Sequence, residues 1–207
     1  MATIYIPFYS RYGNTETMAK AVAEGVREAG AEPKLAFTGD VMTPAEVMQK
    51  DERWLATHER LMREYPLVSL EELGQADGAI FGSPTRFGSL AAQLKNYIDS
   101  MAGLWLSGAL IGKPAGAFTS TGTLHGGQET TIYTMWPPLA HLGFIIVGVP
   151  YSVPELMSTT TGGTPYGPSH VAGPMGDRPP DETELIVCRA LGKRVAEIAT
   201  ILAAAKS

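Results

Sequence analysis

Three short stretches of this chain combine hydroxyl side chains with glycine and could hold an anion or a flat aromatic molecule. The first, residues 10–15, reads Ser-Arg-Tyr-Gly-Asn-Thr and directly follows an apolar stretch. Hydroxyls, backbone N–H groups and the N-terminus of a following helix can together bind a phosphate without a lysine. Gly13 permits the positive φ or close approach that such a turn uses. An ordinary strand-to-helix turn has the same residue types. The other two stretches must therefore decide whether this turn binds an anion.

The second and third stretches would suit the edges of a planar ring. Residues 84–88 read Pro-Thr-Arg-Phe-Gly, where Phe87 offers apolar area and Arg86 a positive charge. Residues 120–127 read Ser-Thr-Gly-Thr-Leu-His-Gly-Gly, so hydroxyls and glycines allow a ligand close to the backbone. The alternatives are that Arg86 is a solvated loop residue, that Phe87 covers the core and that the third stretch is a plain turn.

The elements around these stretches predict an open parallel sheet. Apolar segments typical of buried strands lie at 4–9, 33–37, 76–82, 114–119 and 144–149. Helical periodicity lies at 14–29, 43–65, 90–101, 128–142 and 185–202. This alternation predicts a doubly wound five-stranded parallel α/β sheet in the order 2-1-3-4-5. The three loops then follow strands one, three and four and should meet at one crevice.

Two segments depart from simple alternation. From Thr43-Pro44 onward, apolar pairs recur every seven residues and predict one long helix inserted after strand two. Two interpretations of its apolar stripe, residues 44–65, are open. The stripe packs on its own domain, or it contacts another subunit. Residues 150–180 are rich in Pro and Gly and predict a long loop, which is usually functional or disordered.

Composition limits the classes of protein that fit. The 207 residues suit one α/β domain, 1–207, and the net charge of −5 argues against binding to nucleic acid. The single Cys188 excludes an intrachain disulfide framework and favours a reducing, cytoplasmic compartment. No uncharged apolar stretch reaches the roughly 18 residues of a spanning helix, so we expect no integral membrane contact.

Together these stretches resemble the tryptophan repressor-binding-protein-like (WrbA-like) quinone reductases of the flavodoxin superfamily. Tyr12 in the first loop, the string at 84–88 and a Gly-Gly-Thr-Pro-Tyr-Gly string at 162–167 carry the resemblance. Leu124 and His125 depart from the more glycine-rich family sequence. The resemblance implies a flavodoxin-like fold with bound FMN. The residues implied to bind FMN are Ser10, Arg11, Tyr12, Gly13, Asn14, Thr15, Pro84, Thr85, Arg86, Phe87, Gly88, Ser120, Thr121, Gly122, Thr123, Leu124, His125, Gly126 and His141.

The resemblance also implies the activity, the reduction of quinones by NAD(P)H through FMN. Tyr12 would contact NAD(P)H and Trp105 would line the quinone pocket, which a neighbouring subunit of a homotetramer could complete. FMN would carry the chemistry, so no side chain is predicted as catalytic and no metal is expected. A lone His or Trp on a helix is more often structural.

Other readings remain open at this point. The main alternative is a flavodoxin-like electron carrier without its own small-molecule substrate, and a weaker one is a non-catalytic scaffold with the same fold. His58 and His170 carry no functional prediction, because the sequence places no second ligand or partner near either.

Overall fold

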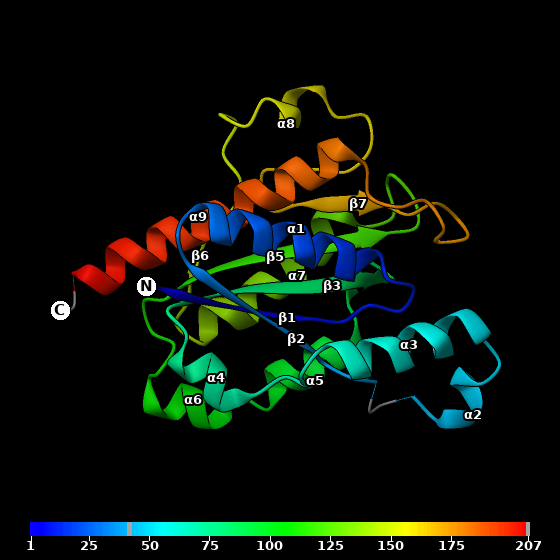
Figure 1. Cartoon of the computed structure of the whole chain (residues 1–207), viewed down its shortest axis with the longest axis horizontal. Helices are drawn as coiled ribbons and strands as arrows, with labels where there is room; N and C mark the ends of the chain where they lie inside the picture. Colours follow the sequence, from blue (N-terminus) through cyan, green and yellow to red (C-terminus); the bar gives the residue numbers. More distant parts are fainter. Residues whose placement is uncertain (41–42, 206–207) are drawn as a thin grey trace.

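A computed structural model describes residues 1–40 and 43–205. Its central sheet is built from parallel strands in the order β2-β1-β3-β5-β6, which confirms the predicted topology (Figure 1). A seventh strand, β7, pairs in parallel with β5, and β4 forms a short antiparallel pair with β3. The strands are β1 (Thr3–Phe8), β2 (Glu32–Phe37), β3 (Gly78–Arg86), β4 (Ser89–Leu90), β5 (Pro114–Thr121), β6 (Ile145–Ile146) and β7 (Ser169–Val171).

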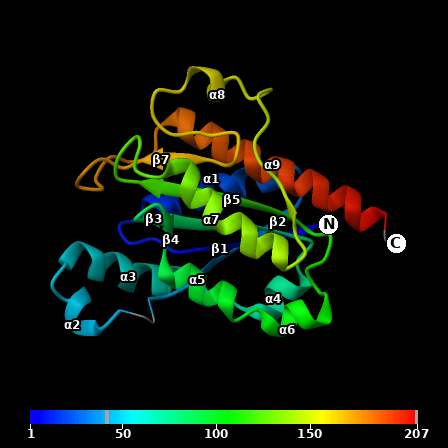
Figure 2. The same cartoon turned by 180° about the vertical axis from the view of Figure 1, so that it is seen from behind.

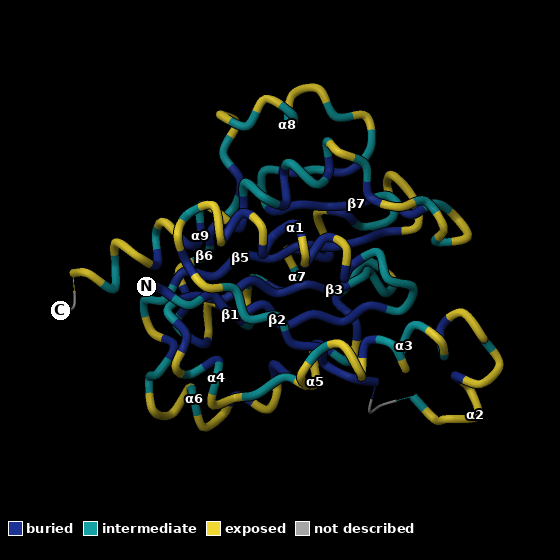
Figure 3. The backbone as a smooth tube through the Cα atoms, in the orientation of Figure 1, coloured by how far each residue is buried: buried dark blue, intermediate teal, exposed yellow. Residues whose placement is uncertain are grey.

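Helices cover both faces of the sheet. On one face lie α1 (Asn14–Glu28) and α9 (Glu182–Ala204), seen in front in Figure 1. On the other lie α4 (Leu70–Gln75), α5 (Ala92–Asp99) and α7 (Gln128–His141), with α7 in front in Figure 2. Because the central strands are covered on both sides, they are buried along most of their length (Figure 3).

Each face has its own apolar core. In β1, Ile4 and Ile6 belong to the core beneath α1 and α9, whereas Tyr5 belongs to the opposite core. This alternation follows from the two-residue period of a strand. The helices α1 and α9 touch backbone to backbone, since a Cβ on Gly192 would lie 2.0 Å from the carbonyl oxygen of Val22. Glycine there lets both helices lie close on the same face.

The prediction of one long helix at 43–65 is wrong. The segment forms two helices, α2 (Ala45–Met48) and α3 (Glu52–Glu64). Asp51 separates them because its side chain accepts a hydrogen bond from the N–H of Trp54 and caps α3. An apolar stripe with a seven-residue repeat does not reveal such a break, and the predicted start at Thr43 lies beside residues 41–42, which are outside the described residues.

The last predicted strand, 144–149, is also too long. Within this segment only Ile145–Ile146, strand β6, pairs with β5, and the pairing lies near the start of β5. Beyond it the N–H of Val149 donates to the carbonyl of Pro165, because the chain of the long loop crosses there. The end of β5 pairs with β7 instead, a strand that sequence patterning did not predict. Four other short elements were not predicted either, namely β4, α4, α6 (Ala102–Ser107) and α8 (Glu155–Ser158).

Within residues 1–40 and 43–205, no helix combines the length and the apolar character needed to cross a bilayer.

Candidate functional site

The loops that follow β1, β3 and β5 meet at the carboxyl ends of the strands, as predicted. Together with the segment after β7 they line a crevice of about 320 Å³, a volume suited to a small-molecule ligand. Its lining residues are Ser10, Arg11, Tyr12, Asn14, Thr15, Pro84, Thr85, Arg86, Ser120, Thr121, Gly122, Ala172, Gly173, Pro174, Met175 and Gly176.

The first loop presents a helix N-terminus to this crevice. Gly13 has a φ of 94°, a left-handed conformation that favours glycine, and α1 begins at the next residue. The buried hydroxyl of Ser10 accepts hydrogen bonds from the N–H groups of Gly13 at 3.1 Å and Glu16 at 3.4 Å. Asn14 and Thr15, the first residues of the helix, line the crevice. An anionic group is favoured at such a position by both the helix dipole and the N–H groups.

The second loop adds a cation. The guanidinium of Arg86 lines the crevice and donates to the carbonyl of Thr85 at 2.8 Å. Burial lowers the pKa of Arg86, and among the described residues it is in no ion pair. A partly buried cation without a carboxylate partner can interact with negative charge on a ligand. Arg86 is therefore not the solvated loop residue of the alternative interpretation.

Phe87 lies at the turn between β3 and β4, with a φ of 53° and a fully exposed ring. A bulky residue with positive φ is strained, and an exposed ring leaves apolar area uncovered. Phe87 thus does not cover the core, which removes one of the alternatives. The turn is held by Thr85, whose hydroxyl accepts from the N–H of Gly88 at 3.2 Å and pairs with Thr131 at 2.7 Å.

The third loop contributes Ser120, Thr121 and Gly122 at the end of β5. The hydroxyl of Thr121 lies 2.9 Å from the carbonyl oxygen of Thr123 and 3.1 Å from that of His170, and its one hydrogen is shared between these two acceptors. This contact fixes the backbone at this edge of the crevice. Further along, Thr123, Leu124 and His125 are exposed and do not line the crevice.

Several predicted residues are therefore adjacent to the crevice rather than part of its lining. They are Gly13, Phe87, Gly88, Thr123, Leu124, His125 and Gly126.

Trp105 and His141 lie elsewhere within this chain. Both line a second cavity of about 350 Å³, between α5, α6 and the end of α7. The third loop meets the first residue of α7, Gln128, whereas His141 is its last, about 20 Å away along the helix axis. The two side chains can therefore act at the crevice only if a second copy of the chain brings them there.

The segment at 172–176 completes the lining of the crevice, and the start of α3 holds that segment in place. Sequence reasoning assigned neither of them to the site. Arg53 donates to the carbonyls of Met175 at 3.1 Å and Gly176 at 2.6 Å, and Asn14 also donates to Gly176, at 3.0 Å. These contacts hold the late loop beside the first loop. The richness of 150–180 in Pro and Gly marked the region as functional or disordered but could not place it.

The start of α3 also holds the first loop. The hydroxyl of Tyr12 donates to Asp51 at 2.6 Å, and the guanidinium of Arg11 lies 3.1 Å from the same carboxylate and 3.9 Å above the ring of Trp54. The hydrogen bond from Tyr12 is the main cause that lowers the pKa of Asp51. The inserted segment thus positions two residues of the candidate phosphate loop.

The fold and the crevice define a class, the flavodoxin-like α/β proteins that bind a ligand at the carboxyl ends of a parallel sheet. A flavodoxin, WrbA-like protein from Agrobacterium tumefaciens superposes with a TM-score of 0.65 at 24% identity, covering 97% of this chain and 99% of that one. Flavodoxin 1 from Bacillus cereus gives a TM-score of 0.59 at 18% identity, covering 96% and 98%. At these identities the likeness shows the fold.

Sequence comparison identifies the family. Residues 9–155 match the family described as NADPH-dependent FMN reductase, so the chain belongs to it. The chain is 45% identical over 202 residues to an NAD(P)H dehydrogenase (quinone) from Geobacter metallireducens, covering 96% of this chain and 98% of the relative. A protein of the same name from Rhodopseudomonas palustris is 43% identical over 201 residues, with 96% and 98% covered. The predicted resemblance to quinone reductases is therefore confirmed by this family match and by relatives of that name.

The residues of the crevice fit FMN chemically. The N-terminus of α1 with Ser10 and Thr15 suits the phosphate group. The loops after β3 and β5 supply backbone groups, hydroxyls and the guanidinium of Arg86, which suit the polar edges of the flavin ring.

Proposed function

We propose that this chain is an FMN-dependent NAD(P)H:quinone oxidoreductase. The observation that carries the proposal is the convergence of Ser10, Thr85 and Thr121 on one crevice, beside a helix N-terminus and an Arg86 with no ion-pair partner among the described residues. Relatives at 45% and 43% identity over nearly the whole chain are named NAD(P)H dehydrogenase (quinone).

Residues 10–15 would hold the FMN phosphate, and residues 84–88 and 120–126 would flank the ring. When bound, FMN supplies hydride acceptance at N5 from NAD(P)H and two-electron donation to a quinone, in two successive half-reactions of a ping-pong cycle. The protein binds and orients the reactants. Because no side chain among the described residues that line the crevice stands out as a proton donor, protons would come from water.

Tyr12 is the proposed contact for NAD(P)H. It lines the crevice, and its ring lies 4.7 Å from the guanidinium of Arg53 while its hydroxyl is fixed on Asp51. These contacts hold a flat surface at the mouth of the crevice, beside the proposed phosphate loop. A nicotinamide could stack against such a surface.

The quinone side would be completed by a second copy of the chain in a homotetramer. Trp105 is 55% exposed and shares the second cavity with His141, so both are accessible to a neighbouring subunit. In that arrangement Trp105 would line the quinone pocket and His141 would contact FMN.

The electron-carrier alternative makes a different demand on the crevice. A carrier needs an exposed flavin edge and a docking surface that is often strongly acidic. Here the net charge is a modest −5. The hydrogen bond from Arg53 of α3 to Gly176 of the late loop holds one wall of a pocket in place. These observations favour the enzyme.

Steady-state oxidation of NADH by FMN-loaded protein tests the proposal. We expect turnover that depends on benzoquinone and is abolished when FMN is removed. An FMN-loaded protein that oxidises no NADH or NADPH with benzoquinone present would support the electron carrier instead, and a protein that binds no FMN would support the scaffold.

A further inference from the structure

Ser120 and His170 form a buried pair at the wall of the crevice. Strand β7 runs beside β5 (Figure 1). Ser120 and His170 are directly opposite each other in the register of these strands, so their side chains lie on the same face of the sheet. Ser120 is 6% exposed and lines the crevice, whereas His170 is fully buried behind it. The Ser120 Oγ lies 2.9 Å from His170 Nδ1. The proposed chemistry makes no use of this histidine.

The surroundings of His170 determine where its proton sits. Its Nε2 lies 3.1 Å from the carbonyl oxygen of Arg178, which can only accept a hydrogen bond. Burial lowers the pKa of His170, an effect that the Glu184 carboxylate opposes from 4.0 Å and that the Arg178 guanidinium reinforces. The ring is therefore neutral with its proton on Nε2. Nδ1 is then an acceptor, and the hydroxyl of Ser120 must donate to it.

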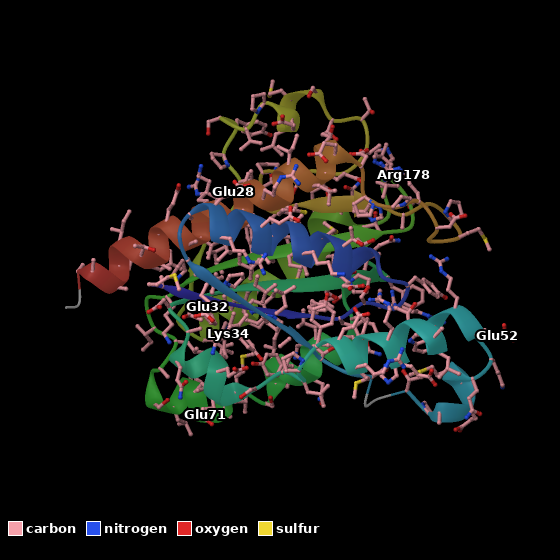
Figure 4. All side chains as sticks on the ribbon, in the orientation of Figure 1. Glu28, Glu32, Lys34, Glu52, Glu71 and Arg178 are labelled. Atoms are coloured by element: carbon pink, nitrogen blue, oxygen red, sulfur yellow. The ribbon has the colours of Figure 1, made fainter. Side chains whose placement is uncertain are left out.

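The carbonyl that fixes this tautomer is itself held firmly. Arg178 lies in the loop between β7 and α9 (Figure 4), and its guanidinium donates to the carbonyl of Val171 at 2.6 Å and to the Glu184 carboxylate at 3.1 Å. Its own N–H donates to the carbonyl of Ala172 at 2.9 Å. Glu184, fully buried, also accepts from the N–H of Gly162 at 3.0 Å. The side chain of His170 therefore has little freedom to turn.

We infer that His170 is a positioning residue that makes the hydroxyl of Ser120 an acceptor toward the crevice. A hydroxyl has one hydrogen and two lone pairs, and the hydrogen is committed to His170. Whatever group contacts Ser120 in the crevice must then be a donor. The inference rests on the proposed function for the identity of that donor, which in FMN would be a ring N–H or a ribityl hydroxyl. Ring nitrogens and carbonyl oxygens that carry only lone pairs are disfavoured there.

The first arm of the test measures FMN dissociation constants of apoprotein by flavin fluorescence. His170→Phe keeps a ring without an acceptor, Ser120→Ala removes the hydroxyl, and His170→Asn places an amide oxygen near the position of Nδ1. We expect His170→Phe and Ser120→Ala each to weaken binding about tenfold. The Ser120→Ala, His170→Phe double variant should bind no more weakly than Ser120→Ala alone, and His170→Asn should stay within about threefold of wild type. Multiplied effects in the double variant, or no effect of His170→Phe, would overturn the inference.

The second arm needs neither FMN nor a folded Phe variant. Nitrogen-15 NMR of the histidine rings in wild-type apoprotein should show His170 neutral at pH 7, with its proton on Nε2, and Ser120→Ala should shift the Nδ1 resonance. A proton on Nδ1 would overturn the inference whatever the first arm shows. Failure of wild-type apoprotein to bind FMN would instead contradict the proposed function, while the NMR result would still decide how Ser120 and His170 share the proton.

Discussion

Arg86 is the residue whose charge bears most directly on the proposed chemistry. It lines the crevice with no ion-pair partner among the described residues, whereas the charge of the other crevice arginine, Arg11, is already paired with Asp51 at 3.1 Å. A cation beside the flavin would stabilise the negative charge that reduction adds. The two arginines therefore provide a matched comparison.

Replacing Arg86 should make bound FMN harder to reduce. Arg86→Gln keeps much of the side-chain size and removes the charge, so we expect the two-electron reduction potential to fall by roughly 30 mV, about 1.4 kcal/mol. Arg11→Gln is the control and should shift the potential less. Spectroelectrochemical titration measures both. An unchanged potential in Arg86→Gln would mean that the guanidinium does not face the reduced flavin.

Sequence patterns could locate most of the crevice because parallel strands end at a common edge. Ser10 follows β1, and Thr85 and Thr121 lie at the carboxyl ends of β3 and β5, so the topology of the sheet alone brings the three residues together. Two groups of residues could not be placed this way. Arg53 and Met175 depend on how the insert and the late loop fold back, and the pairing of Ser120 with His170 depends on β7, which has only three residues.

At the scale of secondary-structure elements, a buried carboxylate joins α1 to α3. Glu16 is 3% exposed and accepts hydrogen bonds from Arg60 of α3, at 3.0 Å to Nη1, and from Tyr65 at 2.9 Å. Lys20 lies 2.6 Å away on its own helix. Burial alone would raise the pKa of Glu16, but these partners outweigh it and lower the pKa to about 2. The network anchors the insert that holds the proposed phosphate loop.

Loss of this carboxylate should destabilise the protein in a pH-dependent way. Because the folded-state pKa is about 2, below the ordinary 4.5, the stabilisation is present above pH 4.5 and is lost as the pH falls toward 2. We expect Glu16→Ala to lower the free energy of unfolding by about 3 kcal/mol at pH 7, and by less at pH 3.

Urea denaturation at both pH values measures the difference. Glu24→Ala is the control, because Glu24 is exposed on the same helix and lies 3.5 Å from Arg189, so its loss should cost less than about 0.5 kcal/mol. An equal deficit for Glu16→Ala at pH 7 and pH 3 would contradict the assignment.

The contact between α3 and the late loop, formed by Arg53 with the carbonyls of Met175 and Gly176, leads to a second prediction at this scale. Arg53→Ala removes the hydrogen bonds to the carbonyls of Met175 and Gly176, so residues 172–176 should open more often. We expect amide hydrogen exchange in this segment to increase about fivefold. Arg63→Ala, at an exposed position near the end of α3, is the control. Unchanged exchange in Arg53→Ala would show that Asn14 alone holds the loop.

Element boundaries were the least predictable part of the fold, for local reasons. The break between α2 and α3 depends on one side chain, Asp51, that caps α3 while bonding Tyr12 and Arg11. The shortening of the last strand depends on Gly148, where a Cβ would lie 2.3 Å from the carbonyl oxygen of Pro165. The first feature is a local helix cap and the second is a tertiary contact, and apolar periodicity encodes neither.

At the scale of the whole molecule, the exposed apolar side chains near the second cavity fit the proposed homotetramer. Trp105 is 55% exposed and Leu106 77% exposed, both on α6. We expect light scattering after size exclusion to give four times the mass of the chain. Leu106→Glu should shift the protein to smaller species, whereas Met157→Glu, at another exposed residue on α8, should not. A wild-type monomer at concentrations where activity persists would contradict the tetramer.

The account as a whole depends on FMN being held in the crevice and reduced there by NAD(P)H. The most direct measurement is the absorbance spectrum of FMN-loaded protein during anaerobic titration with NADH. We predict one FMN bound per chain, loss of the oxidised flavin absorbance on adding one equivalent of NADH, and its return when benzoquinone is added. A spectrum without bound flavin, or a bound flavin that neither NADH nor NADPH bleaches, would contradict the account.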